Sequence, residues 1–360
     1  MLKKRRKTRK IKLGNVEIGG NSPISVQSMT NTDTRDVKST IEQIKRLENA
    51  GCEIVRVAVP DMEAAKRLAE IKNNITIPLI ADIHFDYRLA LESIKQGVDG
   101  LRLNPGNIGS LTKVKQVVEN AREKNIPIRI GVNAGSLDKK LLDKYGGVTP
   151  AALVESALEH INYLEKLNYT NLKISLKASN IELMFHAYKL LAEKVDYPFH
   201  IGVTEAGTVL TGAVKSSVGI TLLLNEGLGD TLRVSLTGPP EKEVQVGYDI
   251  LRCLGLRERG VQLISCPTCG RCGIDLQALA EEVEKRTSGI QKHLKVAVMG
   301  CPVNGPGEAR EADVGIAGGK EKGLLFSKGK KLKTVPQNQL VDELMKEIDK
   351  ILDEGKEEES

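Results

Sequence analysis

The sequence predicts an α/β protein, namely a TIM (β/α)8 barrel followed by a small α+β domain. Eight apolar runs rich in β-branched residues alternate with helix-patterned segments over residues 24–236, which is typical of a parallel sheet. Polar and charged residues stand at the carboxyl ends of nearly all these runs. The alternation has ended by residue 258, and a segment with four of the six cysteines follows. We therefore expect a barrel domain at 1–258 and a second domain at 259–360.

The elements can be assigned in chain order. Residues 10–25 predict a polar hairpin with strands at 11–13 and 16–18. The eight barrel strands are predicted at 24–29, 54–59, 79–85, 100–103, 128–132, 172–176, 200–203 and 231–236, with helices at 37–50, 62–71, 111–124, 149–167 and 181–194 among them. Eight strand–helix units in this length fit a closed barrel better than an open doubly wound sheet, which stays an alternative.

The ends of the predicted strands carry an excess of positive charge. They hold six cations, namely Arg56, Arg102, Arg129, Lys173, Lys177 and Arg233, against two acids, Asp82 and Glu205. In a barrel these ends converge on one mouth, where barrel enzymes place their chemistry. Because buried charges are costly unless paired, this excess predicts a binding site rather than a set of internal ion pairs.

Such a mouth fits a polyanionic substrate, for example a diphosphate, because arginine binds phosphate oxygens through two hydrogen bonds. Two glycine-containing segments do not match nucleotide-binding loops. Residues 318–321 lack the spacing and the hydroxyl of a P-loop, and residues 104–109 lack the spacing of a dinucleotide fingerprint. We therefore expect neither nucleotide hydrolysis nor nicotinamide chemistry.

The net charge of +6 comes from the first residues of the chain. Residues 1–12 hold eight of the 53 Lys and Arg, and the other 45 face 47 acidic residues. We interpret this basic arm as a solvated tail, although such a segment can also contact nucleic acid or anionic lipid. With no Trp and four Phe, the chain lacks the aromatic residues on which bases stack, so no nucleic-acid partner is expected.

No apolar segment follows the basic N-terminus, as it would in a secretory signal. No run approaches the roughly 18 apolar residues of a membrane helix. We therefore expect a cytoplasmic protein without a membrane partner. Six cysteines in 360 residues do not make a disulfide scaffold, and the isolated Cys52 and Cys253 are expected to be small buried hydrophobes.

The second domain is predicted to contain a helix at 274–285, strands at 294–299, 314–317 and 324–326, and a terminal helix at 338–352. Its thiols, Cys266, Cys269, Cys272 and Cys301, fall on predicted loops, where they can collect at one metal. By spacing they could form a four-cysteine zinc site. The Cys-x2-Cys-x2-Cys run is also typical of ferredoxin ligation, so zinc and iron–sulfur both stay open, with iron–sulfur favoured. Glu308 follows Gly305-Pro306-Gly307 and could turn its carboxylate toward Cys301.

Several stretches resemble the 4-hydroxy-3-methylbut-2-enyl diphosphate synthase family, the iron–sulfur enzymes of the non-mevalonate isoprenoid pathway. They are residues 26–32, 81–84, 102–107, 202–207, the Cys-Pro-Thr-Cys motif at 266–269 and the Asn-Gly-Pro-Gly-Glu motif at 304–308. The resemblance covers nearly the whole chain, and the last two motifs are highly specific on a barrel of this kind.

The resemblance implies a TIM barrel followed by a ferredoxin/sulfite-reductase-like domain. It implies a [4Fe–4S] cluster on Cys266, Cys269 and Cys301, with Glu308 as a replaceable fourth ligand. The implied substrate is 2-C-methyl-D-erythritol 2,4-cyclodiphosphate, whose ring is opened, with loss of a hydroxyl as water, by two electrons from ferredoxin or flavodoxin. It also implies a homodimer in which the cluster domain of one chain closes over the barrel mouth of the other.

The resemblance also implies roles for the site residues. Those expected to hold the diphosphate are Arg56, Arg102, Arg129, Lys177, Arg233 and Ser235. Asn133 and Glu205 would face the erythritol part, with Glu205 as an acid/base group, and Asn304 would border the cluster. Asp82 and His84 are expected at the mouth as further candidates for catalysis.

Cys272 stands where the family pattern has no ligand, and we interpret it as a bystander thiol. If it bound iron, the role of Glu308 would no longer hold. Two other functions remain as alternatives. A non-redox phosphosugar-type barrel enzyme with a structural zinc lid would need no reductant, and a nucleic-acid-binding protein that uses the basic arm would bind in a salt-dependent way.

Overall fold

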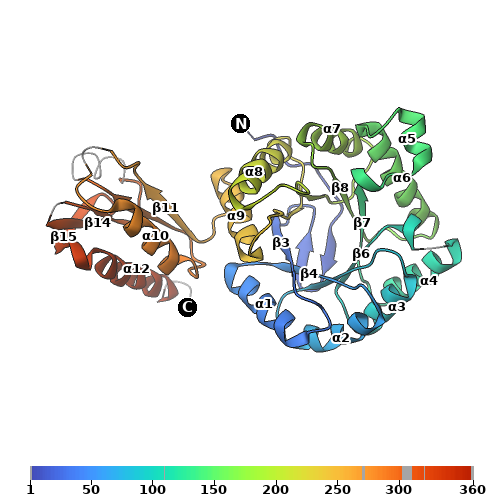
Figure 1. Ribbon diagram of the computed structural model, residues 1–360, viewed down its shortest axis with the longest axis horizontal. Helices are drawn as coiled ribbons and strands as arrows, with labels where there is room; N and C mark the ends of the chain where they lie inside the picture. The colour runs from blue at the N-terminus through green and yellow to red at the C-terminus, as the bar shows by residue number, and fades with distance from the viewer. Residues whose placement is uncertain (1, 109, 270–271, 302–309, 320, 358–360) are drawn as a thin grey trace. The chain divides into compact units, whose positions relative to one another are not determined.

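The computed structural model describes residues 2–108, 110–269, 272–301, 310–319 and 321–357, with side chains through residue 354. The chain divides into two compact units, Met1–Arg257 and Glu258–Ser360, and the division lies one residue before the predicted boundary. In the first unit, helices lie outside a ring of strands (Figure 1). No helix of the described part of the chain is both long enough and apolar enough to cross a membrane.

The first unit is the predicted TIM barrel. Its parallel strands are β3 (Ser25–Met29), β4 (Ile54–Ala58), β5 (Leu79–Asp82), β6 (Gly100–Leu103), β7 (Ile128–Asn133), β8 (Leu172–Lys177), β9 (His200–Ile201) and β10 (Thr231–Leu232). They pair in the order β8-β7-β6-β5-β4-β3-β10-β9. A parallel bridge between Ile174 and Phe199 joins the two ends of this order, so the sheet closes and the alternative of an open doubly wound sheet is wrong.

Nine α-helices of the described residues lie around these strands. They are α1 (Val37–Ala50), α2 (Met62–Asn73), α3 (Tyr87–Lys95), α4 (Leu111–Glu123), α5 (Lys139–Tyr145), α6 (Pro150–Lys166), α7 (Ile181–Ala192), α8 (Val209–Asn225) and α9 (Pro240–Cys253). Capping side chains fix several of their starts: Asp36, Asp61, Asp86, Thr149 and Asn180 each accept a backbone N–H of the first turn. The helices named from the sequence did not include α3, α5, α8 or α9. In α8, Lys215 is the one charged residue, so no polar stripe marks an outer face.

A hairpin closes the amino-terminal end of the barrel. Strands β1 (Ile11–Leu13) and β2 (Val16–Ile18) pair as predicted, and their apolar side chains pack on Ile54 and Ile80 of the barrel strands. A Cβ atom at Gly100 would lie 2.4 Å from Leu13 Cδ1. Glycine at this position therefore makes room for the hairpin.

The basic arm is not the solvated tail that the sequence predicted. Arg5 forms an ion pair with Asp230 at 2.7 Å. Arg6 donates to the carbonyls of Val195 and Tyr197 and lies with its guanidinium 4.1 Å from the Phe199 ring centroid. These partners precede β9 and β10 in the chain, so the arm lies against the amino-terminal end of the barrel. The prediction failed because its acceptors are about 190 to 225 residues away in the sequence.

The second unit holds one five-stranded sheet in the order β11-β12-β13-β14-β15. The strands are β11 (Val261–Ser265), β12 (Leu294–Met299), β13 (Val314–Ala317), β14 (Lys322–Ser327) and β15 (Lys330–Pro336), packed with α10 (Leu276–Thr287) and α12 (Leu340–Glu357). The first three strands are parallel and the last two antiparallel to their neighbours. The sequence did not predict β11 or β15. The latter is an exposed edge strand with three lysines, a composition that protects edges from further pairing.

The arm contacts predict a stability effect. Replacing Arg5 and Arg6 together with Ala should lower the free energy of unfolding by about 3 kcal/mol, because Asp230 would lose its ion-pair partner and the carbonyls of Val195 and Tyr197 would lose the Arg6 donors. Urea unfolding measures this change. As a matched control, replacing the exposed Lys4 and Lys7 with Ala removes the same two charges and should cost no more than about 0.5 kcal/mol each. Equal losses in both double variants would contradict the contacts.

Candidate functional site

The barrel register brings the predicted cations next to one another. Met29 pairs with Arg56 across β3 and β4, Arg102 pairs with Arg129 across β6 and β7, and Asn133 pairs with Lys177 across β7 and β8. Because the closed sheet points alternate side chains inward, these residues share one interior. We call the residues Arg56, Asp82, Arg102, Arg129, Lys177, Arg233 and Ser235 the mouth cluster.

Asp82 is the acidic centre of the mouth cluster. It is 4% exposed, and its carboxylate lies 3.5 Å from Arg56 Nε and 3.2 Å from Arg102 Nη1. Burial raises the pKa of Asp82, but the charges of Arg56, Arg102 and Arg129 outweigh burial and lower it to about 2. Asp82 is therefore ionised at neutral pH, and it can act as a counterion but not as a proton donor.

His84 lies beside this ion pair, on the loop after β5. Its Nε2 is 2.9 Å from Arg102 Nη1. Since a guanidinium group only donates, Nε2 must accept, and the imidazole is neutral. Burial lowers the pKa of His84, Asp82 raises it in part, and Arg102 lowers it further. His84 is thus a neutral hydrogen-bonding group at the mouth, with its ring partly buried against Arg102.

Arg129 is a buried cation without a directly bound counterion in the part of the chain that the structure describes. It is 1% exposed, and among the described residues its Nε, Nη1 and Nη2 have no hydrogen-bond partner. Arg56 Nη1 and Lys173 Nζ are buried in the same way. Burial, followed by the charges of Arg56 and Arg102, lowers the pKa of Arg129 well below its usual value. Buried donors without partners are rare in folded proteins, and here they fit an anionic ligand.

The remaining members of the mouth cluster line a small pocket. Its walls are Lys177, His200, Gly202, Val203, Thr204, Arg233 and Ser235, and its volume is about 10 Å³, which is room for a single water molecule. Burial, and then Arg56 and Arg129, lower the pKa of Lys177 well below its usual value. An anion at this pocket would therefore find a cluster of donors and would favour the protonated form of Lys177.

Glycine at position 131 creates space within the mouth. A Cβ there would lie 2.9 Å from Arg102 Nε and 3.3 Å from Ser175 Oγ. Any other side chain would push against the Arg102 guanidinium. Gly131 therefore allows Arg102 to lie flat along β7, with its Nη2 3.5 Å from the Gly131 carbonyl.

Sequence reasoning missed two residues of the site. The Met29 sulfur lies 3.2 and 3.1 Å from Nε and Nη2 of Arg56 and 3.6 Å from Nη1 of Arg233. Glu243, which is 3% exposed, binds Arg233 through both carboxylate oxygens. Met29 is the last residue of the first barrel strand, so its place at a strand end could have marked it as a site candidate. Glu243 lies inside α9, and nothing in the sequence pattern marks it.

Glu205 and Asn133 lie at the rim rather than among the buried charges. Glu205 is exposed and has a φ of 51°, a left-handed conformation that is uncommon for a glutamate and often marks functional loops. Asn133 is the last residue of β7 and is half-buried. The second buried acid of the mouth is Glu243.

The cysteine motifs lie at the ends of adjacent parallel strands. Cys266 directly follows β11, Cys301 comes two residues after β12, and Ser265 pairs with Val298 in the shared ladder. The Gly300 N–H donates to the Cys266 sulfur at 3.3 Å. Within the described residues no three His, Cys, Asp or Glu side chains gather as a metal site. Whether these residues fit a metal is therefore judged from their ligand type. Thiols are soft ligands, which suit zinc or an iron–sulfur cluster. Asn304 and Glu308 lie outside the described residues.

The other cysteines have different surroundings. The Cys272 thiol donates to the Ile274 carbonyl at 3.3 Å, and its sulfur would lie 2.6 Å from a Cβ at Gly300. Burial raises the pKa of Cys52 to about 12, so the prediction of an inert buried thiol is confirmed there. It is wrong for Cys253, which is exposed at the last residue of α9.

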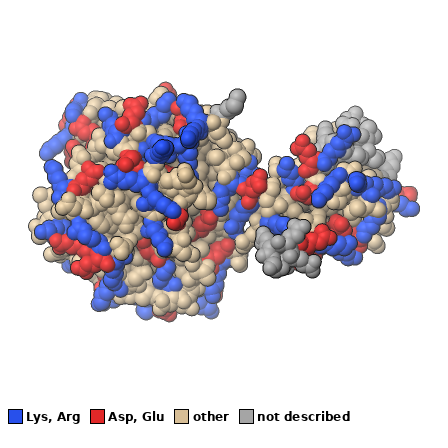
Figure 2. All heavy atoms as spheres, turned by 180° about the vertical axis from the view of Figure 1, so that it is seen from behind, with Lys and Arg blue, Asp and Glu red and all other residues tan. Residues whose placement is uncertain are grey.

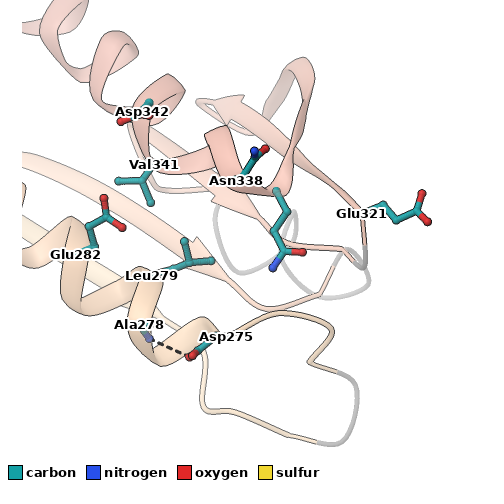
Figure 3. Close-up of a pocket in the computed structure, with 9 residues that line it drawn as sticks. Asp275, Ala278, Leu279, Glu282, Glu321, Asn338, Val341 and Asp342 are labelled. Atoms are coloured by element: carbon teal, nitrogen blue, oxygen red, sulfur yellow. Dashed lines mark hydrogen bonds between the residues drawn. The ribbon is translucent and has the colours of Figure 1, made fainter.

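A second and larger pocket lies within the carboxy-terminal unit, between α10, α12 and the turn before β14 (Figure 3). Its volume is about 610 Å³, and it is lined by Asp275, Ala278, Leu279, Glu282, Glu321, Gln337, Asn338, Val341 and Asp342. Leu279 and Val341 form its apolar floor. Its four carboxylates repel a polyanion, so this pocket does not fit the ligand that the mouth cluster predicts.

The face of the molecule in Figure 2 shows no continuous basic stripe. On the face in Figure 2, lysine and arginine are mixed with aspartate and glutamate over the barrel unit. A nucleic-acid interface is typically a continuous basic stripe. The basic arm, which was the one candidate for such a role, uses Arg5, Arg6 and Arg9 to bind the barrel itself.

The ion pairs of Asp82 predict a pH-dependent stability. Asp82→Asn should lower the free energy of unfolding at pH 7 by about 3 kcal/mol, because Arg56 and Arg102 lose their counterion. The pKa of Asp82 is about 2 in the folded protein and about 3.9 in an unfolded chain. Its stabilisation is therefore complete above pH ~4 and is lost as the pH falls toward 2. Urea unfolding between pH 7 and pH 3 should show the two proteins converging, and a constant difference would contradict this account.

Comparison with known proteins agrees with the geometry. The model of the GcpE TIM-barrel domain matches residues 8–248, and that of the GcpE protein C-terminal domain matches residues 262–350. A relative from Caldanaerobacter subterraneus subsp. tengcongensis is 62% identical over 98% of this chain and 100% of its own length. One from Geobacter sulfurreducens is 62% identical over 97% and 99%, and one from Clostridium acetobutylicum is 61% identical over 95% and 98%.

All three relatives bear the name 4-hydroxy-3-methylbut-2-en-1-yl diphosphate synthase (flavodoxin). Their similarity extends over both units of the chain, across the barrel mouth and the cysteine motifs alike. Since the two family domains match in succession and the relatives align almost from end to end, this chain belongs to the GcpE family.

Proposed function

We propose that this chain reduces 2-C-methyl-D-erythritol 2,4-cyclodiphosphate to 4-hydroxy-3-methylbut-2-enyl diphosphate, with electrons from flavodoxin. The relatives at 62% and 61% identity bear the name of this flavodoxin-linked synthase. The observation that carries the proposal is the mouth cluster, where buried guanidinium nitrogens of Arg56, Arg102 and Arg129 lack partners among the described residues, as does the ammonium group of nearby Lys173. A cyclic diphosphate supplies the negative charge that these groups need.

The mouth cluster would hold the diphosphate through Arg56, Arg102, Arg129, Lys177, Arg233 and Ser235. Guanidinium groups on four strands approach such a ligand from several sides, and each can donate two hydrogen bonds to phosphate oxygens. Asp82 keeps Arg56 and Arg102 in place. The closed sheet holds the strands that carry these residues, and because the pocket has a volume of about 10 Å³, their side chains must move apart to admit a cyclic diphosphate.

The rim residues would act on the erythritol part. Loss of a hydroxyl as water requires a proton, and Glu205 is the candidate to supply or remove it. Its exposed position and left-handed backbone support a functional rather than a packing role. Asn133 and the neutral His84 would orient the hydroxyl groups by hydrogen bonds.

Cys266, Cys269 and Cys301 would hold a [4Fe–4S] cluster, with Glu308 as a replaceable fourth ligand and Asn304 beside it. This group supplies low-potential electrons and a Lewis-acidic iron when bound. Two observations support the assignment, namely the adjacent strand ends that carry Cys266 and Cys301 and the Gly300 N–H that points at the Cys266 sulfur. Hydrogen bonds to sulfur are among the features that set the potential of such clusters. Ferredoxin stays an alternative donor, and the cytoplasmic location stays a prediction.

The chain would work as a homodimer, with the cluster domain of one chain over the barrel mouth of the other. An apolar stripe on α8 supports a protein partner for the barrel. Its members lie four residues apart, with exposed fractions of 79% for Leu210, 59% for Val214, 49% for Val218 and 42% for Leu222. Such contiguous apolar surface is typical of protein interfaces. An uncharged stripe is also self-complementary across a two-fold axis.

The function is tested on anaerobically purified protein. We expect about four irons and four sulfides per chain and conversion of the cyclic diphosphate with reduced flavodoxin. Cys301→Ser should abolish both iron content and conversion. Cys272→Ser is the matched control, and it should retain both because this thiol binds the Ile274 carbonyl. About one zinc with no sulfide would instead favour the non-redox barrel enzyme with a structural zinc lid.

The dimer is tested by charge substitution on the stripe. Leu210→Glu combined with Val214→Glu should convert the dimer to monomer in light scattering after size-exclusion chromatography, because two buried carboxylates would meet across the interface. Leu111→Glu on α4, where Leu111 is 68% exposed, should leave the mass unchanged. A dimeric double variant would exclude α8 from the interface.

A further inference from the structure

Glu243 binds Arg233, one of the arginines of the mouth cluster. It lies in the first turn of α9, and its side chain is 4% exposed. Its Oε2 accepts Arg233 Nε at 3.0 Å and Ser28 Oγ at 2.9 Å, while its Oε1 accepts Arg233 Nη2 at 3.1 Å and the Leu236 N–H at 3.1 Å. All four contacts are direct hydrogen bonds, so this carboxylate is fully satisfied.

The two bonds to Arg233 fix the plane of its guanidinium group. A carboxylate that binds Nε and one Nη in parallel leaves the other edge of the group free. On that edge, Nη1 lies 3.6 Å from the Met29 sulfur, and Arg233 lines the small pocket with Lys177 and Ser235. Glu243 therefore leaves Nη1 of Arg233 unbound, and the Arg233 side chain lines the pocket that the ligand would enter.

Glu243 also fixes the backbone nearby, because it accepts a hydrogen bond from the Leu236 N–H. Leu236 directly follows Ser235, which is another proposed phosphate ligand. One carboxylate thus fixes an arginine side chain and the backbone on the carboxyl side of a serine. The Ser28 hydroxyl anchors the same carboxylate to β3, so Glu243 itself has little freedom to move.

Arg233 needs such an anchor because the mouth repels it. Arg56, Lys177 and Arg102 share the same interior, and the charge of Arg233 lowers the pKa values of Arg56 and Lys177. In the absence of a counter-charge, this repulsion favours rotation of the Arg233 side chain toward solvent. Glu243 opposes that rotation before any ligand has entered.

We propose that Glu243 is a positioning residue that sets Arg233 and Ser235 for one phosphate group of the substrate. The proposal deepens, and rests on, the proposed function. Because Glu243 acts on binding groups and not on the reacting carbon, its loss should weaken substrate binding more than it slows turnover.

The test uses Glu243→Gln in the holoenzyme. This substitution keeps the shape but replaces one accepting oxygen with an NH2 group, which cannot accept from Arg233. KM for the cyclic diphosphate should rise roughly ten- to hundredfold, since the loss of one partner of a buried charge pair has effects of this order. kcat and the iron content should stay within about threefold of wild type. An unchanged KM would overturn the proposal.

Glu53→Gln provides a matched control for general loss of stability. Glu53 forms a comparable pair, with Arg257 Nη2 at 3.0 Å and the Val26 N–H at 2.9 Å, but it contacts no member of the mouth cluster. Both variants should unfold at lower urea concentration, and KM should rise for Glu243→Gln alone. A similar rise in both would show that Glu243 has a merely structural role.

A double-mutant cycle tests whether Glu243 acts through Arg233. In an Arg233→Gln background, Glu243→Gln should raise KM by a smaller factor than it does in the wild-type background, because only its contact with the Leu236 N–H beside Ser235 is left to lose. Additive increases would overturn the proposed route.

Calorimetric binding of inorganic pyrophosphate separates this proposal from the proposed function. Glu243→Gln should weaken pyrophosphate binding, and Glu53→Gln should not, even if the wild-type protein fails to convert the cyclic diphosphate. Failure of conversion alone would contradict the proposed function. Equal pyrophosphate affinity of the wild type and Glu243→Gln would contradict the proposed role of Glu243.

Discussion

Mutual repulsion among the buried cations of the mouth is the constraint on which the rest of the site depends. Arg102 and Arg129 lie on the adjacent strands β6 and β7, and Arg56 lies on β4, with only β5 between β4 and β6, so the three cannot move apart without breaking the ladder. Asp82 and Glu243 offset part of this repulsion, and each binds a different part of the cluster. The remaining positive charge has no partner among the described residues. It is the source of the affinity for a polyanion, and the apolar packing of helices around the barrel stabilises the fold against it.

The interior of the barrel and the pocket of the carboxy-terminal unit carry charges of opposite sign. The barrel interior is cationic, whereas the pocket of the carboxy-terminal unit is rimmed by Asp275, Glu282, Glu321 and Asp342. A diphosphate is attracted to the first and repelled by the second. The carboxy-terminal unit instead presents soft sulfur donors at adjacent strand ends. Each unit therefore suits one part of a reductive reaction on an anionic substrate, namely ligand capture in the barrel and electron delivery at the thiols.

Much of the fold and half of the site follow from local patterns in the sequence. The barrel strands were predicted because apolar runs alternate with amphipathic helices, and the mouth cations because they stand within or directly after these strands. Glu243, Met29 and the arm were different. Glu243 is recognisable only once α9 is packed against β3 and Arg233, and the arm only once β9 and β10 have formed. The helix α8 was missed because its outward face is apolar, which removes the polar stripe that marks a surface helix.

The arm also has a consequence for the order in which the protein assembles. Arg5 and Arg6 are synthesised well before their partners Asp230 and Tyr197, which come about 190 to 225 residues later in the chain. The arm therefore stays unbound and strongly basic until nearly the whole barrel has left the ribosome. Its docking is a long-range contact that closes late. The arm can therefore bind the amino-terminal end of the barrel only after β10, the last strand of the barrel, is in place.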